Sequence, residues 1–171
     1  SNSDLIGLDL INTGSYKKYN IRLDSSAIKN IISSSDLIIG KVYKIKSTSD
    51  GLGGLDTDFT SVGSINNSIG TFFVADSEYL GSGTGEVYEV DLKEYERESY
   101  LDIVQAGNFK IGSIYRIKSI NNGIGGLNTD FTALGSIKNE IGEFFVAKNV
   151  GTNTGSAYEI DIYLNKFNKN T

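Results

Sequence analysis

The chain contains no cysteine, histidine, methionine, tryptophan or proline. Without cysteine it can form no disulfide and offers no thiolate nucleophile. Without histidine it lacks the commonest general base and the commonest ligand for transition metals. Serine–histidine–aspartate triads, zinc sites and blue-copper sites are therefore excluded, and carboxylates, lysine, tyrosine and hydroxyl groups are what remains for catalysis.

Charge of one sign and long apolar runs are also missing. The 171 residues include 16 Lys and Arg and 21 Asp and Glu, a net charge of -5, with both signs interspersed. A nucleic-acid or anionic-membrane partner needs a basic patch, which this pattern does not provide. There is no run of about 18 apolar residues, so we expect no membrane-spanning segment. The predicted partners therefore include neither nucleic acid nor membrane.

The chain contains an internal sequence repeat. Residues 40–75 align without a gap with residues 112–147, and about two thirds of the aligned positions are identical. The comparison divides the chain into an N-terminal segment (1–39), a first module (40–92), a connector (93–111), a second module (112–163) and a polar tail (164–171). Chemistry that needs one unique set of residues is not expected in both copies.

Each module predicts about three strands. In the first module, residues 42–46 and 86–92 alternate apolar and polar side chains, which is typical of strands with one buried face. Residues 71–75 are apolar on both faces, which favours a central strand. Three short strands bury too little to be stable alone. The expected fold is therefore all-β, with two tandem duplicated β-modules closing a shared pseudo-two-fold barrel or sandwich.

One helical turn is expected between the first two strands of each module. In the first copy, Thr57 is expected at the N-cap, Asp58 in the first turn and Gly63 just past the end. Phe59 then faces the core. The corresponding residues of the second copy are Thr129, Asp130, Phe131 and Gly135.

Outside the modules the pattern is weaker. Residues 5–11 and 19–23 predict strands separated by a turn. Residues 25–32 fit either a short helix or a strand, and the connector fits a strand or a short helix equally well.

Three carboxylates in the first module invite a calcium site. Asp50, Asp56 and Asp58 cluster on a glycine-rich loop, which is what a hard cation prefers. In the second copy Asn122 and Asn128 replace the first two. Asn and Asp are interchangeable in tight turns, because both tolerate left-handed backbone and bond their own main chain. The comparison favours turn chemistry over a bound cation, and we expect no cofactor.

The connector contains a run of acidic residues, Glu94, Glu96 and Glu98. Paired carboxylates can hydrolyse glycosides. Here they alternate with Lys93 and Arg97, which indicates a solvated charged segment. The sequence therefore predicts no catalytic residue, and we expect a protein that is not an enzyme.

Two places are candidates for contact with a partner. The apolar residues Leu5, Ile6 and Leu8 lie outside the repeat and could add a strand to the edge of a neighbouring sheet. Tyr79 lies in a loop insertion that only the first module has. Aromatic side chains on loops are common contact residues.

At the level of the module, the sequence resembles a repeat of tailed-bacteriophage virion structural proteins. That repeat runs as Y-x-I, then T-D-F-T-x-x-G, then F-x-A, then G-x-G-T-G. The matching residues of the first copy are Tyr43, Ile45, Thr57, Asp58, Phe59, Thr60, Gly63, Gly70, Phe73, Ala75, Gly83, Thr84 and Gly85, with counterparts from Tyr115 to Gly155. Departures from it are Ser64 and Ser136, where Ala is usual, and Asn153 in place of the loop glycine.

The resemblance implies a virion location and a non-enzymatic structural role, as a capsid decoration protein, a head fibre or a tail accessory. Its implied partners are other virion proteins, with the chain present in many copies or as a homo-oligomer. It transfers no catalytic residue, because the matched positions are strand, turn and cap positions. The alternative is a carbohydrate-binding or adhesive β-module that uses loop tyrosines.

Overall fold

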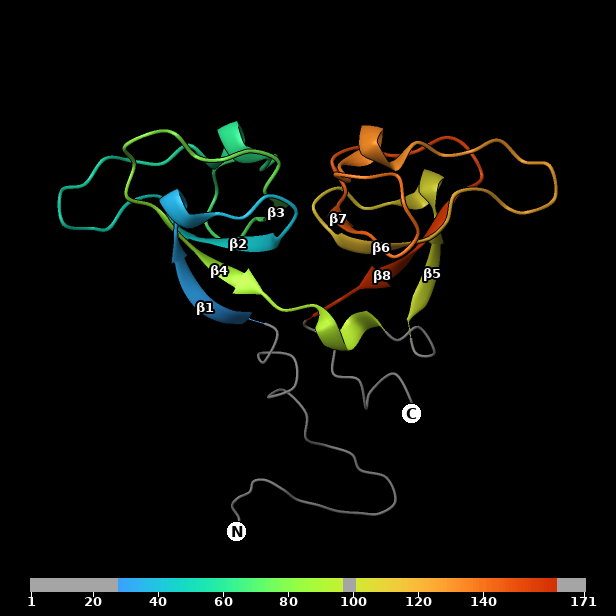
Figure 1. Cartoon of the computed structure of the whole chain (residues 1–171), viewed down its shortest axis with the longest axis horizontal. Helices are drawn as coiled ribbons and strands as arrows, with labels where there is room; N and C mark the ends of the chain where they lie inside the picture. Colours follow the sequence, from blue (N-terminus) through green and yellow to red (C-terminus); the bar gives the residue numbers. More distant parts are fainter. Residues whose placement is uncertain (1–27, 97–100, 163–171) are drawn as a thin grey trace, which may run out of the picture. The chain divides into compact units, whose positions relative to one another are not determined.

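The computed structural model describes residues 28–96 and 101–162 (Figure 1). Residues Lys29–Ile160 form one compact unit. The strands expected at 5–11 and 19–23, and with them Leu5, Ile6 and Leu8, lie outside the described residues. The described strands are β1 (Ile28–Ser33), β2 (Val42–Ser47), β3 (Phe72–Val74), β4 (Glu86–Val90), β5 (Asp102–Gln105), β6 (Ile114–Ser119), β7 (Phe144–Val146) and β8 (Ser156–Ile160). Short 3-10 helices lie between them: η1 (Ser34–Asp36), η2 (Phe59–Val62), η3 (Lys93–Glu96), η4 (Ala106–Asn108) and η5 (Phe131–Leu134).

The strands form two four-stranded antiparallel sheets with the same internal order. The first sheet has the order β1-β4-β2-β3 and the second β5-β8-β6-β7. Their registers agree as well. Tyr43 lies opposite Phe73 in the first sheet, and Tyr115 lies opposite Phe145 in the second. Both sheets are open, so the closed barrel is not formed, and the arrangement is compatible with the sandwich alternative.

Each sheet begins with a strand that lies outside the repeated modules. β1 lies largely within residues 25–32, whose sequence fits either a helix or a strand. β5 lies in the connector, which also contains η3. Ile31 on β1 and Ile103 on β5 are 53% and 54% exposed. Both strands lie at the end of their sheet's order and are only partly covered. A half-covered edge strand has a weak apolar period, which is why the sequence left its type open.

The expected helical turn is present in both halves but begins one residue later than expected. The N-cap residues are Asp58 and Asp130, not Thr57 and Thr129. Each Asp side chain accepts a hydrogen bond from the backbone N–H two residues later. Thr and Asp are both good N-cap residues, so the sequence alone could not decide between adjacent candidates.

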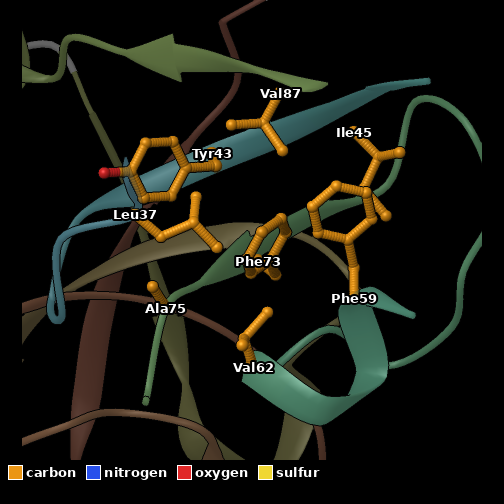
Figure 2. Packing of buried hydrophobic residues seen from close by; sticks show 8 residues of the cluster. All are labelled: Leu37, Tyr43, Ile45, Phe59, Val62, Phe73, Ala75 and Val87. Atoms are coloured by element: carbon orange, nitrogen blue, oxygen red, sulfur yellow. The ribbon is translucent and has the colours of Figure 1, made fainter. Parts of the chain in front are cut away.

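The inner face of the first sheet packs against η2 to form a hydrophobic cluster, shown in Figure 2. Phe59 and Val62 point from η2 toward Phe73 (Figure 2). The Phe59 and Phe73 ring centroids are 5.7 Å apart, and those of Tyr43 and Phe73 are 5.9 Å apart. The whole cluster is Leu37, Tyr43, Ile45, Phe59, Val62, Phe73, Ala75 and Val87. Fully burying one such side chain contributes roughly 1.5–3 kcal/mol, so these contacts are a main source of stability.

The second sheet repeats this packing with one more aromatic ring. Phe109 takes the place of Leu37, and its ring centroid lies 4.4 Å from that of Tyr115 and 5.6 Å from that of Phe145. The Phe131 and Phe145 centroids are 5.7 Å apart. Edge-to-face and tilted pairs at these distances add to the energy of burial.

The expectation that residues 71–75 form a central strand is wrong. β3 stands at the end of its sheet's order, although Phe73 and Val74 are both buried. The second face of β3 is covered because β3 and β2 lie close to β7 of the other sheet. An ion pair between Lys148 and Asp76, at 3.3 Å, also joins the two halves.

Candidate functional site

Two glycine-rich loops of the same construction follow β2 and β6. In the first glycine loop (residues 50–56), the Oδ1 of Asp50 accepts hydrogen bonds from the backbone N–H groups two and four residues later, at 2.9 and 3.1 Å. In the second glycine loop (residues 122–128), the Oδ1 of Asn122 accepts the equivalent bonds at 3.1 and 2.9 Å. Both loops are therefore held from the inside by one side chain.

A threonine from another part of the chain anchors each loop. The Oγ1 of Thr84 accepts a hydrogen bond from the Asp50 backbone N–H at 3.0 Å and donates one to the Leu55 carbonyl at 3.2 Å. Thr154 makes the same two bonds in the second glycine loop, at 3.1 and 2.9 Å. These hydrogen bonds connect the start and the end of each glycine loop to the segment just before β4 or β8.

The loops present large aliphatic side chains to solvent. We call Leu52 and Leu55 the first apolar tip; these side chains are 89% and 64% exposed. Ile124 and Leu127 form the second apolar tip, with exposures of 86% and 72%. Figure 1 shows that each glycine loop extends away from its own sheet. The side chains are thus held in water by a hydrogen-bonded loop and are not used by the protein's own core.

This arrangement is suited to contact with another surface. A side chain that is already exposed on an ordered loop loses little conformational entropy on binding, and its transfer from water is favourable. A single exposed Leu is ordinary, but two on one loop, with two equivalents 72 positions later, form a repeated feature. We take the two apolar tips as the candidate functional site.

The three calcium candidates each serve a separate local purpose. Asp50 closes the first glycine loop, and Asp56 accepts a hydrogen bond from the Thr48 hydroxyl at 3.2 Å. Asp58 accepts bonds from the Thr60 hydroxyl and backbone N–H, at 2.6 and 3.0 Å. Within residues 28–96 and 101–162, no group of three or more acidic residues is placed to hold a metal ion. The geometry favours the turn chemistry expected from the second copy.

These hydrogen bonds also change the acidity of the carboxyl groups. The backbone N–H groups of Leu52 and Gly54 lower the pKa of Asp50 below its usual value. The hydroxyl and then the backbone N–H of Thr60 lower the pKa of Asp58, and Thr132 does the same to the pKa of Asp130. Hydrogen bonds to the ionised form stabilise it. All three side chains are therefore carboxylates at neutral pH, suited to accepting bonds rather than to donating protons.

The remaining motif residues hold the backbone together. The Thr57 hydroxyl accepts a hydrogen bond from the Gly85 N–H at 2.8 Å, and Thr129 does so from Gly155 at 2.8 Å. Phe59 and Phe131 are fully buried, as their cores require.

Gly63 and Gly135 end the 3-10 helices with φ of 114° and 117°. A Cβ at either position would collide with the carbonyl oxygen of Val74 or Val146.

Tyr79 is turned toward the protein. Its ring is partly buried against the first hydrophobic cluster, and its hydroxyl accepts a hydrogen bond from the Gly83 N–H at 3.1 Å. The neighbouring Leu80, in contrast, is 89% exposed.

Sequence reasoning treated the glycine loops as turns and passed over the apolar tips. A signal was present, since a large aliphatic residue stands at positions 52 and 55 and again at 124 and 127. Glycine-rich loops are otherwise small and polar, so two retained aliphatic residues were informative.

Comparison with known proteins gives no match: no protein-family model, no curated protein and no solved structure is significantly similar to the chain. Among the residues that the structure describes, no helix has the length and apolar character needed to cross a membrane.

Proposed function

We propose that the chain is a non-enzymatic structural protein of a bacteriophage virion, acting through surface contacts with other particle proteins. The single observation that carries the proposal is the pair of apolar tips, Leu52 with Leu55 and Ile124 with Leu127, held out on two equivalent hydrogen-bonded loops. The residues that match the phage repeat support it, because they cap, anchor or pack these same elements. A capsid decoration, head-fibre or tail-accessory position fits such a role.

The finer architecture is part of the same proposal. We infer that the two sheets are tandem duplicates related by a pseudo-two-fold axis and packed as a sandwich. The shared strand order and register support this, as does the recurrence of both Asp caps. Duplication would explain why one chain carries two copies of an otherwise costly exposed apolar feature.

Two contact sites on one chain have a quantitative consequence. When both tips engage sites on the same particle, the second contact forms at high effective concentration. Avidity can exceed the affinity of either contact by about 10²–10⁴ when the geometry allows both to bind. A protein bound in many copies on a symmetric particle therefore needs only modest individual contacts.

The test uses the full chain and phage particles recovered from a host that carries its gene. We expect the chain to be present in purified particles in many copies, as judged by mass spectrometry. A variant in which both tips are replaced (Leu52→Ser, Leu55→Ser, Ile124→Ser and Leu127→Ser) should keep its circular dichroism spectrum and lose particle binding. The matched control is Ile69→Ser with Ile141→Ser, which removes two aliphatic side chains of similar exposure, 71% and 68%, from the loops before β3 and β7.

The possible outcomes separate the hypotheses. Absence of the chain from purified particles contradicts the virion role. Presence in particles with binding unaffected by the tip variant rejects the tips and leaves the N-terminal segment as the docking element. In that case a chain lacking residues 1–24 should fold and fail to bind. Binding of the chain to a glycan array, weakened by Tyr79→Ala, would instead support the adhesive module.

A further inference from the structure

The second glycine loop contains a dipeptide with its own chemistry. Asn122-Gly123 is the one Asn-Gly pair in the chain, and the equivalent pair in the first glycine loop is Asp50-Gly51. Asn122 and Gly123 are both exposed, and a Cβ placed on Gly123 would meet nothing within 4 Å. A glycine nitrogen is the least hindered backbone nucleophile, and here the space beside the Gly123 Cα is also open.

The loop also polarises the Asn122 carboxamide. Its Oδ1 accepts two backbone hydrogen bonds, from the N–H of Ile124 at 3.1 Å and from that of Gly126 at 2.9 Å. Both partners are donors, so the atom that they contact is the oxygen. Two backbone N–H groups at about this distance are the arrangement that stabilises an oxyanion in acyl transfer. Negative charge that develops on Oδ1 during attack on Cγ would be stabilised in the same way.

The attacking nitrogen is held beside this group. The Gly123 N–H donates a hydrogen bond to the Oδ1 of Asn121 at 2.8 Å, which keeps the nitrogen oriented within the loop. The Thr154 hydroxyl anchors the backbone of Asn122 on the other side, at 3.1 Å. The nucleophile, the electrophile and the oxyanion donors therefore belong to one ordered turn.

We propose that Asn122 is a self-catalysed deamidation site. The Gly123 nitrogen loses its proton to solvent and bonds to the Asn122 Cγ, with negative charge forming on Oδ1. Nδ2 takes up a proton from solvent, the Cγ–Nδ2 bond breaks as the Cγ–Oδ1 double bond re-forms, and ammonia leaves a succinimide ring. Water opens the ring at one of its two carbonyls and yields aspartate or isoaspartate. The net reaction consumes one water and releases one ammonia, with no oxidation or reduction.

The first glycine loop shows how an aspartate fits this turn. Asp50 accepts the same two hydrogen bonds with a carboxylate in an equivalent turn. The folded loop therefore accommodates Asp at position 122 without rearrangement. Because a carboxylate is a poor electrophile, the Asp50-Gly51 pair is stable in the ionised form, and so is the fraction of position 122 that becomes aspartate.

The reaction would change the charge of the second apolar tip. Conversion of Asn122 adds one negative charge beside Ile124 and Leu127, so that the second glycine loop acquires the carboxylate of the first. Where the product is aspartate, positions 50 and 122 of the two glycine loops then carry the same charge. This inference does not depend on the proposed virion function, because it needs only the loop.

The test compares one asparagine in two settings. The full chain and a synthetic peptide of residues 119–128 are incubated in the same neutral buffer, and conversion is followed by peptide mapping with mass spectrometry. We expect Asn122 to lose ammonia several-fold faster in the folded chain than in the peptide. Equal or slower conversion in the folded chain would overturn the proposal, since the loop would then protect the amide.

Variants identify the loop as the cause. Thr154→Val removes the anchor of the second glycine loop and should bring the rate down toward that of the peptide. Thr84→Val makes the same change in the first glycine loop and should leave the rate at Asn122 unchanged. An equal effect of both variants, or none from Thr154→Val, would reject the role of the ordered loop. Asn66 serves as the internal reference, because its Oδ1 also accepts a backbone bond, from Ser68 at 2.9 Å, without a following glycine.

Discussion

The hydroxyl of Thr57 donates a hydrogen bond to the hydroxyl of Ser34 at 3.2 Å, and both side chains are fully buried. Ser34 in turn donates to the Gly83 carbonyl at 3.1 Å, so the two hydroxyls join η1 to the loop before β4. In the second half Thr129 is retained, but Ala106 stands where Ser34 would be. The Thr hydroxyl is thus common to both halves and its Ser partner is not.

This difference predicts that Thr57→Val and Ser34→Ala lower the free energy of unfolding by different amounts. Thr57→Val removes the acceptor of the buried Gly85 N–H, and an unsatisfied buried group costs about 1–3 kcal/mol. Ser34→Ala should cost about 1 kcal/mol or less, because the second half already packs with alanine there. Urea unfolding of both variants measures the difference. A Ser34→Ala variant as unstable as Thr57→Val would show that Ser34 makes a contribution of its own.

A second prediction concerns the glycine loops. Asp50→Asn and Asn122→Asp exchange residues that already accept the same backbone bonds in the two halves. We expect both variants to keep the thermal midpoint of the parent at neutral pH, whereas Asp50→Ala and Asn122→Ala lower it. The alanine variants leave two loop N–H groups without their acceptor. A large loss in either exchange variant would show that the two turns are not interchangeable.

The third prediction concerns acid. The pKa values of Asp58 and Asp130 are lowered by the hydroxyl and backbone donors of Thr60 and Thr132. A lowered folded-state pKa gives stability that is present above the unfolded value of about 3.9 and is lost as pH falls through the folded value. The free energy of unfolding should therefore decline from about pH 5 downward.

Replacing Asp58 and Asp130 by asparagine separates the effect of the carboxylate charge from that of the N-cap hydrogen bond. Asn is as good an N-cap as Asp but does not titrate in this range. The double variant Asp58→Asn with Asp130→Asn should therefore fold and show a shallower decline of unfolding free energy with acid, measured by urea unfolding at a series of pH values. The same steep decline in the variant would place the acid sensitivity in other groups.

Much of the fold could be predicted because the chain repeats itself. Residues 42–46 and 86–92 became β2 and β4 with small changes at their ends, because strict alternation has one structural meaning. The order of strands could not be predicted in the same way. β4 lies between β1 and β2, and this pairing joins segments that are distant along the chain. Local patterns do not contain that information, so barrel and sandwich stayed open.

The candidate site was less accessible to sequence reasoning for a different reason. Asp50, Asp56 and Asp58 attracted attention because carboxylates suggest chemistry, yet each accepts its own separate hydrogen bonds from nearby residues. Leu52 and Leu55 carry no chemistry and lie among glycines. Only the structure shows that these side chains are held in solvent and not folded inward.

The last prediction tests whether the glycines of the repeat are equally constrained. Gly63 ends η2 with φ of 114°, and a Cβ there would collide with the Val74 carbonyl oxygen. Gly51 also has positive φ, at 72°, but a Cβ there would meet nothing within 4 Å. Gly51→Ala therefore has backbone strain alone, about 1–2 kcal/mol.

Gly63→Ala adds a steric clash to this strain, and we expect a total of about 2–4 kcal/mol. Denaturant unfolding under one set of conditions measures the loss of unfolding free energy in both variants. Gly135→Ala should lose as much as Gly63→Ala, because the Val146 carbonyl oxygen lies against Gly135 as that of Val74 lies against Gly63. Relief of the clash would require η2 to move away from β3, which would loosen the packing of Phe59 on Phe73. The near-ultraviolet circular dichroism of Gly63→Ala should therefore weaken as well. Equal costs for Gly51→Ala and Gly63→Ala would mean that the β3 backbone yields without loss and that the closeness of this contact is not needed for stability.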